Sequence, residues 1–137
     1  MKQKGQGLVE FALTFPIYIF LLFALIYSGI LFYDYATLTN IARESTREAA
    51  IVQESHPNGR YASIETFYKT NRVHLVTSLY QPDGADYFTI QEDNDRYVTT
   101  NITMALPNDA SYLMHQVLPE QYTIRIRMHK DFLDSGS

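Results

Sequence analysis

The chain has 137 residues and a formal net charge of −4, with 15 acidic and 11 basic side chains. That length corresponds to one domain, and the acidic balance argues against nucleic-acid binding, which needs a clustered basic surface. The sequence contains no cysteine, which excludes disulfides, thiolate metal sites and cysteine nucleophiles.

The apolar residues are concentrated between Phe11 and Tyr33, a stretch without a charged side chain. About 23 residues in a helix that rises roughly 1.5 Å per residue span about 35 Å, enough to cross a hydrocarbon core of about 30 Å. Lys2 and Lys4 precede this stretch and Asp34 follows it. The positive-inside rule therefore predicts a single pass with the N-terminus in the cytoplasm and the C-terminus outside. A cleaved secretory signal peptide is the alternative, but its apolar region is only about 7–15 residues long and precedes small residues.

Two residues are unusual for a simple membrane anchor. Pro16 lies inside the apolar stretch, where it removes one backbone donor and tends to kink a helix. The freed carbonyl then needs a partner from a neighbouring helix or side chain. Glu10 lies at the start of the stretch, and a carboxylate at the bilayer centre costs about 2.5–3.5 kcal/mol, less near the edge. Position alone leaves two interpretations of Glu10 open: a residue at headgroup level favoured by the helix dipole, or a residue with a further role.

The surroundings of Glu10 carry a family resemblance. A short basic leader ends in Gly5, and Glu10 follows five residues later at the head of the apolar helix. This arrangement resembles the processing site of type IV prepilins, which a membrane-embedded aspartyl prepilin peptidase cuts after the glycine. The stretch 6–16, with its proline, and the segments 35–44 and 47–50 resemble the TadE-like proteins, pseudopilins of tight-adherence (Flp, type IVc) pili.

The resemblance implies a cut between Gly5 and Gln6, which would create a new ammonium group on Gln6. It further implies that the carboxylate of Glu10 pairs with the N-terminal amine of a neighbouring subunit. Such an ion pair is much stronger at low dielectric than in water, and either member left unpaired is costly. The implied partners are other pilin subunits (a major Flp-type pilin and minor pilins), the prepilin peptidase, an assembly platform in the inner membrane and the lipid bilayer.

Helical periodicity continues beyond the apolar stretch, so one helix is expected over residues 8–54. One face of its second half carries small and apolar residues at steps of three and four: Leu38, Ile41, Ala42, Ser45, Ala49 and Val52. The other face is charged, with Arg43, Glu44, Arg47 and Glu48. We interpret this charge run as a solvated face in which Glu44 reaches Arg47.

The remainder reads as a second, shorter helix followed by strands. The segment 62–80 is partly helical in its spacing, and Gln81 to Asp86 is expected to form a loop. Strand patterns cover 87–91, 97–106 and 122–129, and a short helix is expected within 109–118. In the last strand Tyr122, Ile124, Ile126 and Met128 lie on one face. The predicted fold is α+β and pilin-like: a long N-terminal helix followed by a small antiparallel sheet.

The sequence is therefore divided into a leader (1–5), the transmembrane half (6–33) and the extracytoplasmic half (34–54) of one helix, a head (55–134) and a flexible tail (135–137). No catalytic constellation and no cofactor motif is found, so an enzyme is not expected. Acidic residues cluster at Asp83, Asp86, Glu92, Asp93 and Asp95. They lack the EF-hand pattern and favour a solvated turn over a calcium site. The four histidines, His56, His74, His115 and His129, lack ligand spacing.

Two functional interpretations stay open. The first is a minor pilin or pseudopilin, processed and assembled into a tight-adherence pilus, with a role in adhesion, pilus initiation or the pilus tip. It would begin in the bacterial inner membrane and end in the extracellular pilus. The second is a membrane-anchored extracytoplasmic binding module whose helix stays in the inner membrane.

Overall fold

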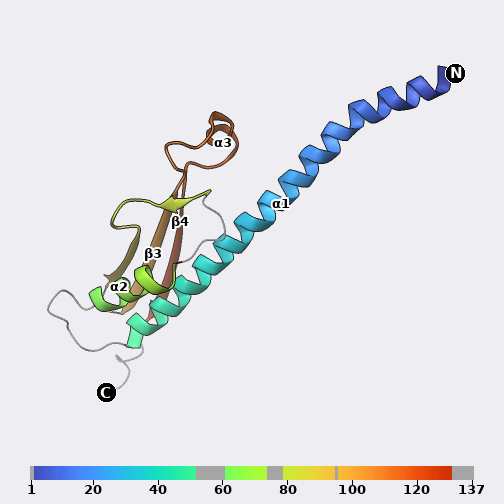
Figure 1. Ribbon diagram of the computed structural model, residues 1–137. Coiled ribbons are helices and arrows are strands. Elements are labelled where there is room, and N and C mark those ends of the chain that lie inside the picture. Colours follow the sequence, from blue (N-terminus) through green and yellow to red (C-terminus); the bar gives the residue numbers. More distant parts are fainter. Residues whose placement is uncertain (1, 52–60, 74–78, 95, 131–137) are drawn as a thin grey trace. The chain divides into compact units, whose positions relative to one another are not determined.

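The computed structural model describes residues 2–51, 61–73, 79–94 and 96–130 (Figure 1). Contacts divide the chain into two compact units, Met1–Tyr33 and Asp34–Ser137. Helix α1 (Lys2–Ile51) runs through both units, and the other described helices and strands belong to the second. A long N-terminal apolar helix followed by a small antiparallel sheet is an α+β arrangement, as predicted.

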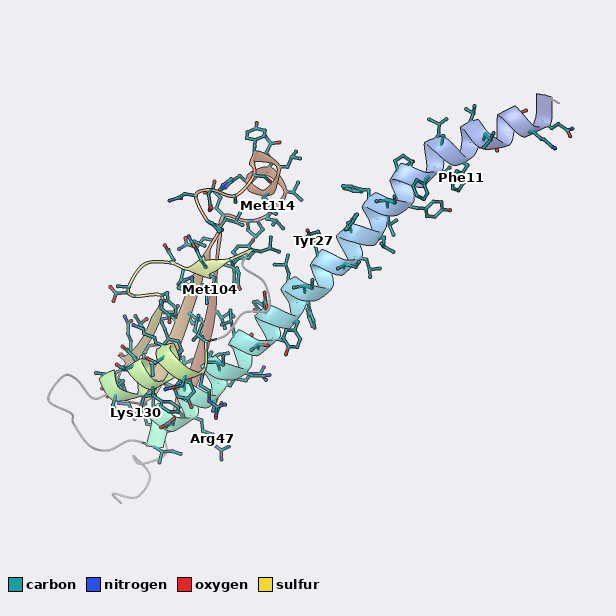
Figure 2. The ribbon with its side chains drawn as sticks, viewed as in Figure 1. Phe11, Tyr27, Arg47, Met104, Met114 and Lys130 are labelled. Carbon is teal, nitrogen blue, oxygen red and sulfur yellow. The ribbon has the colours of Figure 1, made fainter. Side chains whose placement is uncertain are left out.

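The first unit is helix alone. Its large apolar side chains are exposed along the helix, from Leu8 and Phe11 to Ile26 and Tyr27 (Figure 2). The helix is long and apolar enough to cross a membrane. It begins at Lys2 and not near Leu8 as predicted, because Lys and Gln in the leader are themselves good helix formers.

The second unit is built on a four-stranded antiparallel sheet of β1 (Gln81–Pro82), β2 (Phe88–Asp93), β3 (Tyr97–Ala105) and β4 (Gln121–His129). β4 pairs with β3 along its whole length. β2 and β1 share the other edge of β3, where β1 pairs only with its last two residues. The described turn between β2 and β3 contains Asn94 at φ 62°, a left-handed conformation that asparagine tolerates.

The alternation predicted for the strands is present, but the prediction of three strands was wrong. Residues 81–86 were expected to be a loop, yet Gln81 and Pro82 form the short strand β1. Two residues cannot show a period of two, and the pairing depends on backbone contacts with β3. Proline, which has no N–H, is tolerated there because β1 lies at an edge.

One face of the sheet is buried beneath α1 and α2 (Figure 1). The sheet contributes Phe88, Ile90, Val98, Thr100, Ile102, Met104 and Ile124 to the core. From α1 the core receives Leu38, Ile41, Ala42, Ser45, Thr46, Ala49 and Ala50. The predicted stripe is thus confirmed, apart from Val52, which lies outside the described residues. Its small side chains let helix and sheet approach closely, and the Thr46 and Thr100 hydroxyls are hydrogen bonded at 2.8 Å.

Helix α2 (Ala62–Asn71) buries Ile64 and Tyr68. The Tyr68 ring stacks on Phe88 with 6.2 Å between centroids, and its hydroxyl donates to Glu48 of α1 at 2.9 Å. Arg72, just after α2, pairs with Glu44 of α1 at 3.2 Å. The charged face of α1 is exposed as predicted, but Glu44 pairs with Arg72 and not with Arg47.

The helix predicted over 62–80 is shorter than expected, since α2 ends at Asn71. The Asn71 side-chain amide donates to the Phe67 carbonyl at 3.1 Å, and the Arg72 and Val73 amides both donate to the Tyr68 carbonyl. These bonds satisfy the last carbonyls and close the helix. Residues 74–78 lie outside the described part of the chain, as does the tail at 135–137. Helix α3 (Tyr112–Val117) falls within the predicted range 109–118.

Candidate functional site

The residues that carry the prepilin resemblance lie in the first turns of α1. Gly5, Gln6 and Glu10 are all helical and exposed. Gln6 and Glu10 are four residues apart, which places them on one face of the helix, one turn from each other. In the part of the chain that the structure describes, Glu10 has no ion-pair partner. Its carboxylate is therefore available to a group supplied from outside the described chain.

No packing contact requires glycine in these first turns. A methyl group at Gly5 or Gly7 would meet no atom within 4 Å. Each glycine weakens a helix by about 1 kcal/mol relative to alanine. The two glycines flank Gln6, so they weaken the helix on both sides of this residue.

Pro16 lies inside the continuous helix. Because it has no N–H, the carbonyl of Ala12 loses its ordinary helical partner. The nearby Thr14 hydroxyl hydrogen bonds to Glu10 O at 2.8 Å and lies 3.3 Å from Phe11 O, so it serves other carbonyls. Among the exposed apolar side chains of the first unit, the Glu10 carboxylate has no ion-pair partner and the Ala12 carbonyl has lost its ordinary helical donor.

Three residues of the head's acidic cluster are structural partners. Asp93 pairs with Arg127 at 3.1 Å, and Asp83 accepts a hydrogen bond from Gln121 at 2.6 Å. Glu92 pairs with Lys130. Within the described ranges, which exclude Asp95, no group of three or more metal-ligating side chains is placed to hold a metal ion.

The buried Lys130 was missed by the sequence interpretation. Its side chain is 1% exposed, whereas that of its partner Glu92 is 38% exposed. Figure 2 labels Lys130 at the end of the sheet opposite α3. The alternation of β4 contained the signal, because Lys130 follows Ile124, Ile126 and Met128 in the same phase and so belongs to the core face.

A second missed feature is a group of tyrosines where β4 begins. Tyr122 packs against Tyr80 in an edge-to-face contact at 4.8 Å and against Tyr35 at 6.1 Å. The Tyr80 hydroxyl donates to the Pro119 carbonyl at 2.8 Å. Burial, followed by the negative charge of the buried Asp34, raises the pKa of Tyr122 to about 12. These contacts fix the start of the head's portion of α1 against the first residues of β4.

The geometry suits association better than catalysis. The exposed apolar helix and its unpaired carboxylate need partners, and the head's ionisable groups described above are mostly engaged with one another. The model of the TadE-like protein family matches residues 5–47. That match contains Gly5, Gln6, Glu10 and Pro16 and ends before the sheet. No curated protein and no solved structure matches the chain. The N-terminal segment of this protein, residues 5–47, is TadE-like, as its sequence predicted, and the chain is consistent with a TadE-like tight-adherence pilus protein.

Proposed function

We propose that the protein is a minor pilin or pseudopilin of a tight-adherence pilus. The observation that carries the proposal is the motif Gly5-Gln6 with Glu10, at the head of an exposed apolar helix and inside the TadE-like segment. Residues 11–33 would hold the precursor in the bacterial inner membrane, with the head outside. Prepilin peptidase would cut after Gly5, and the mature subunit would enter the pilus with other pilins, delivered by the inner-membrane assembly platform.

Processing would precede assembly for an electrostatic reason. The intact chain offers a carboxylate at Glu10 but no ammonium group on Gln6, because Gln6 is inside a peptide bond. Cleavage creates that ammonium group one helical turn from Glu10. In a low-dielectric environment the Glu10 carboxylate of one subunit and the Gln6 ammonium group of its neighbour attract each other strongly, and either charge left unpaired is costly. A neighbouring subunit that offers the complementary charge at the right height is therefore favoured over one shifted along the helix.

Two glycines provide a matched pair of variants for the processing step. Gly5→Leu puts a branched side chain at the proposed cut, and Gly7→Leu makes the same change two residues later. A Cβ atom at either position would meet no atom within 4 Å, so the two variants start from equally open surroundings. Intact mass and N-terminal sequencing of membrane and sheared-filament fractions, with and without the peptidase, provide the measurement. We expect a chain that begins at Gln6 for the native protein and for Gly7→Leu, and an uncut chain for Gly5→Leu.

The role of Glu10 is tested separately, in chains that are already cut. Glu10→Gln removes the charge and keeps the shape, and the exposed Glu120 of the head provides the matched control Glu120→Gln. We expect Glu10→Gln to be processed but lost from sheared filaments, and Glu120→Gln to be incorporated normally. A native chain that begins at Met1 and stays in membranes would instead support the anchored binding module.

A further inference from the structure

Among the described residues of the head, helix α3 carries the densest group of exposed large apolar side chains. Tyr112 is 74% exposed, Leu113 70% and Val117 79%, all within one six-residue helix. Leu113 and Val117 are four residues apart and so lie on the same face. Scattered exposed apolar residues are ordinary, but a contiguous apolar patch marks an interaction surface.

The position of α3 within the head points to what covers this patch. The helix lies in the connection between Ala105, the end of β3, and Gln121, the start of β4. Tyr122 in β4 packs against Tyr35, which lies in the first turn of α1 inside the head. The α3 connection therefore extends from the Asp34 end of the sheet, beyond β3 and β4 (Figure 1). Tyr33 ends the apolar stretch, so chain continuity alone puts the membrane surface at this end of the head.

The chemistry of α3 suits a lipid surface. The helix has no acidic or basic residue apart from His115, and residues 107–120 contain no lysine or arginine. Attraction to lipid phosphate is therefore not the driving force, which leaves apolar insertion. Tyrosine is enriched at membrane interfaces, where the ring lies among acyl chains and the hydroxyl reaches water. Tyr112 of α3, whose hydroxyl accepts a hydrogen bond from Gln116 at 2.7 Å, and Tyr35 of α1, which is 48% exposed, combine an apolar ring with a polar tip in this way.

A protein partner fits the same surface less well. A stable protein interface buries about 800 Å² on each partner, contributed by roughly 20–30 residues. A single exposed helix of six residues is far smaller. Interfacial insertion needs no such area, because binding scales with whatever apolar surface enters the boundary between headgroups and acyl chains.

We propose that α3 is a second membrane contact, in which Tyr112, Leu113 and Val117 insert into the outer face of the bilayer next to which the head emerges. The inference goes beyond the proposed pilin function. It rests on one part of that proposal, the location of residues 11–33 in the membrane. Contact at both α1 and α3 would restrict how the head tilts and rotates on the membrane before assembly. It would thereby orient the head toward incoming subunits.

The absence of cysteine makes a labelling experiment direct. The full chain is reconstituted in phospholipid nanodiscs with a single nitroxide label introduced through Leu113→Cys or Val117→Cys. Collision with oxygen reports lipid exposure, and collision with a nickel chelate reports water exposure. Gly29→Cys, in the apolar helix with open space for a side chain, is the lipid reference. Ser63→Cys, exposed on α2, is the water reference.

We expect labels at 113 and 117 to be oxygen-accessible and nickel-protected, as at 29, and the label at 63 to be nickel-accessible. Leu113→Asp should then raise the nickel accessibility of a label at 117 several-fold, whereas Asn108→Asp in the same connection should not. Labels at 113 and 117 that match position 63 would overturn the inference, and protection from both reagents would assign the patch to a protein contact. A water-exposed label at 29 would instead overturn the membrane location itself.

Discussion

The buried ion pair of the head gives the sharpest stability prediction, because its two members differ so much in exposure. Lys130 is 1% exposed and Glu92 38% exposed. The amide of Lys130 also donates to the Arg96 carbonyl at 2.8 Å, which holds the residue at the end of β4. Removal of the carboxylate leaves a buried ammonium group without this partner, whereas removal of the ammonium leaves a carboxylate that water already reaches. We therefore expect Glu92→Gln to destabilise the head more than Lys130→Met.

The magnitudes follow from this asymmetry. Removal of one partner from a buried pair typically costs about 3–5 kcal/mol when the other charge is left buried and uncompensated. Because Glu92 is partly exposed and Lys130 has a further interaction, we expect a smaller cost for Glu92→Gln, about 1.5–3 kcal/mol, the range for a hydrogen bond to a charged group. For Lys130→Met we expect less than about 1 kcal/mol. Asp93→Asn supplies the control: its pair with Arg127 is roughly half exposed on both sides, so about 0.2–1 kcal/mol is expected.

Urea unfolding of the full chain in detergent micelles measures these differences, with near-ultraviolet circular dichroism of the head tyrosines as the signal. The slope of free energy against urea must stay the same across the variants, so that a shift in midpoint is a shift in stability. An equal loss for Glu92→Gln and Asp93→Asn would refute the reasoning. So would a larger loss for Lys130→Met than for Glu92→Gln.

Three further predictions use the same assay. Phe88→Ala, at a side chain with no exposure, should cost about 3–5 kcal/mol, and a loss below about 1 kcal/mol would contradict its place in the core. Thr46→Val should cost about 1–3 kcal/mol because it leaves the buried Thr100 hydroxyl without this partner; an unchanged midpoint would argue against that bond. Folding raises the pKa of Tyr122 from 10.0 to about 12. The contribution of this residue to the free energy of unfolding is therefore intact below pH 10 and is lost as pH rises from 10 to 12. Tyr122→Phe should flatten that alkaline loss, and an unchanged pH profile would contradict the shift.

The fold was predictable in those helices and strands where buried residues recur at a regular spacing along the sequence. The face from Leu38 to Ala49 is buried because every third or fourth residue of α1 meets the sheet. The alternation in β4 is correct for the same reason: Ile124 is buried and its neighbours Thr123 and Arg125 are exposed. The short helix α3 was predictable because Pro107 and Pro119 bound its connection.

The rest depends on contacts between distant residues, which no local pattern contains. β1 exists because β3 offers it backbone partners, and its two residues have no alternation of their own. Glu44 has two possible cationic partners, Arg47 and Arg72. It pairs with Arg72 because α2 packs beside α1. For the candidate site, the positions of Glu10 and Pro16 on one long helix were predictable, whereas Gly5 and Gln6 lie before the predicted helix start at residue 8. Their processing and pairing stay predictions, because both involve molecules other than this chain.

The distribution of unsatisfied polar groups explains why assembly specificity is expected at the N-terminus. In lipid, apolar side chains gain little from exchanging acyl chains for a neighbouring helix, so apolar packing alone selects register weakly. Thr14 and Ser28 already bond to carbonyls of their own helix, at 2.8 and 3.0 Å, and offer little to a neighbour. The Glu10 carboxylate and the Ala12 carbonyl opposite Pro16 are different, because each lacks an ordinary partner in the described helix. A neighbouring subunit that satisfies both gains most at one register, so these two groups are where we expect the filament contact to be decided.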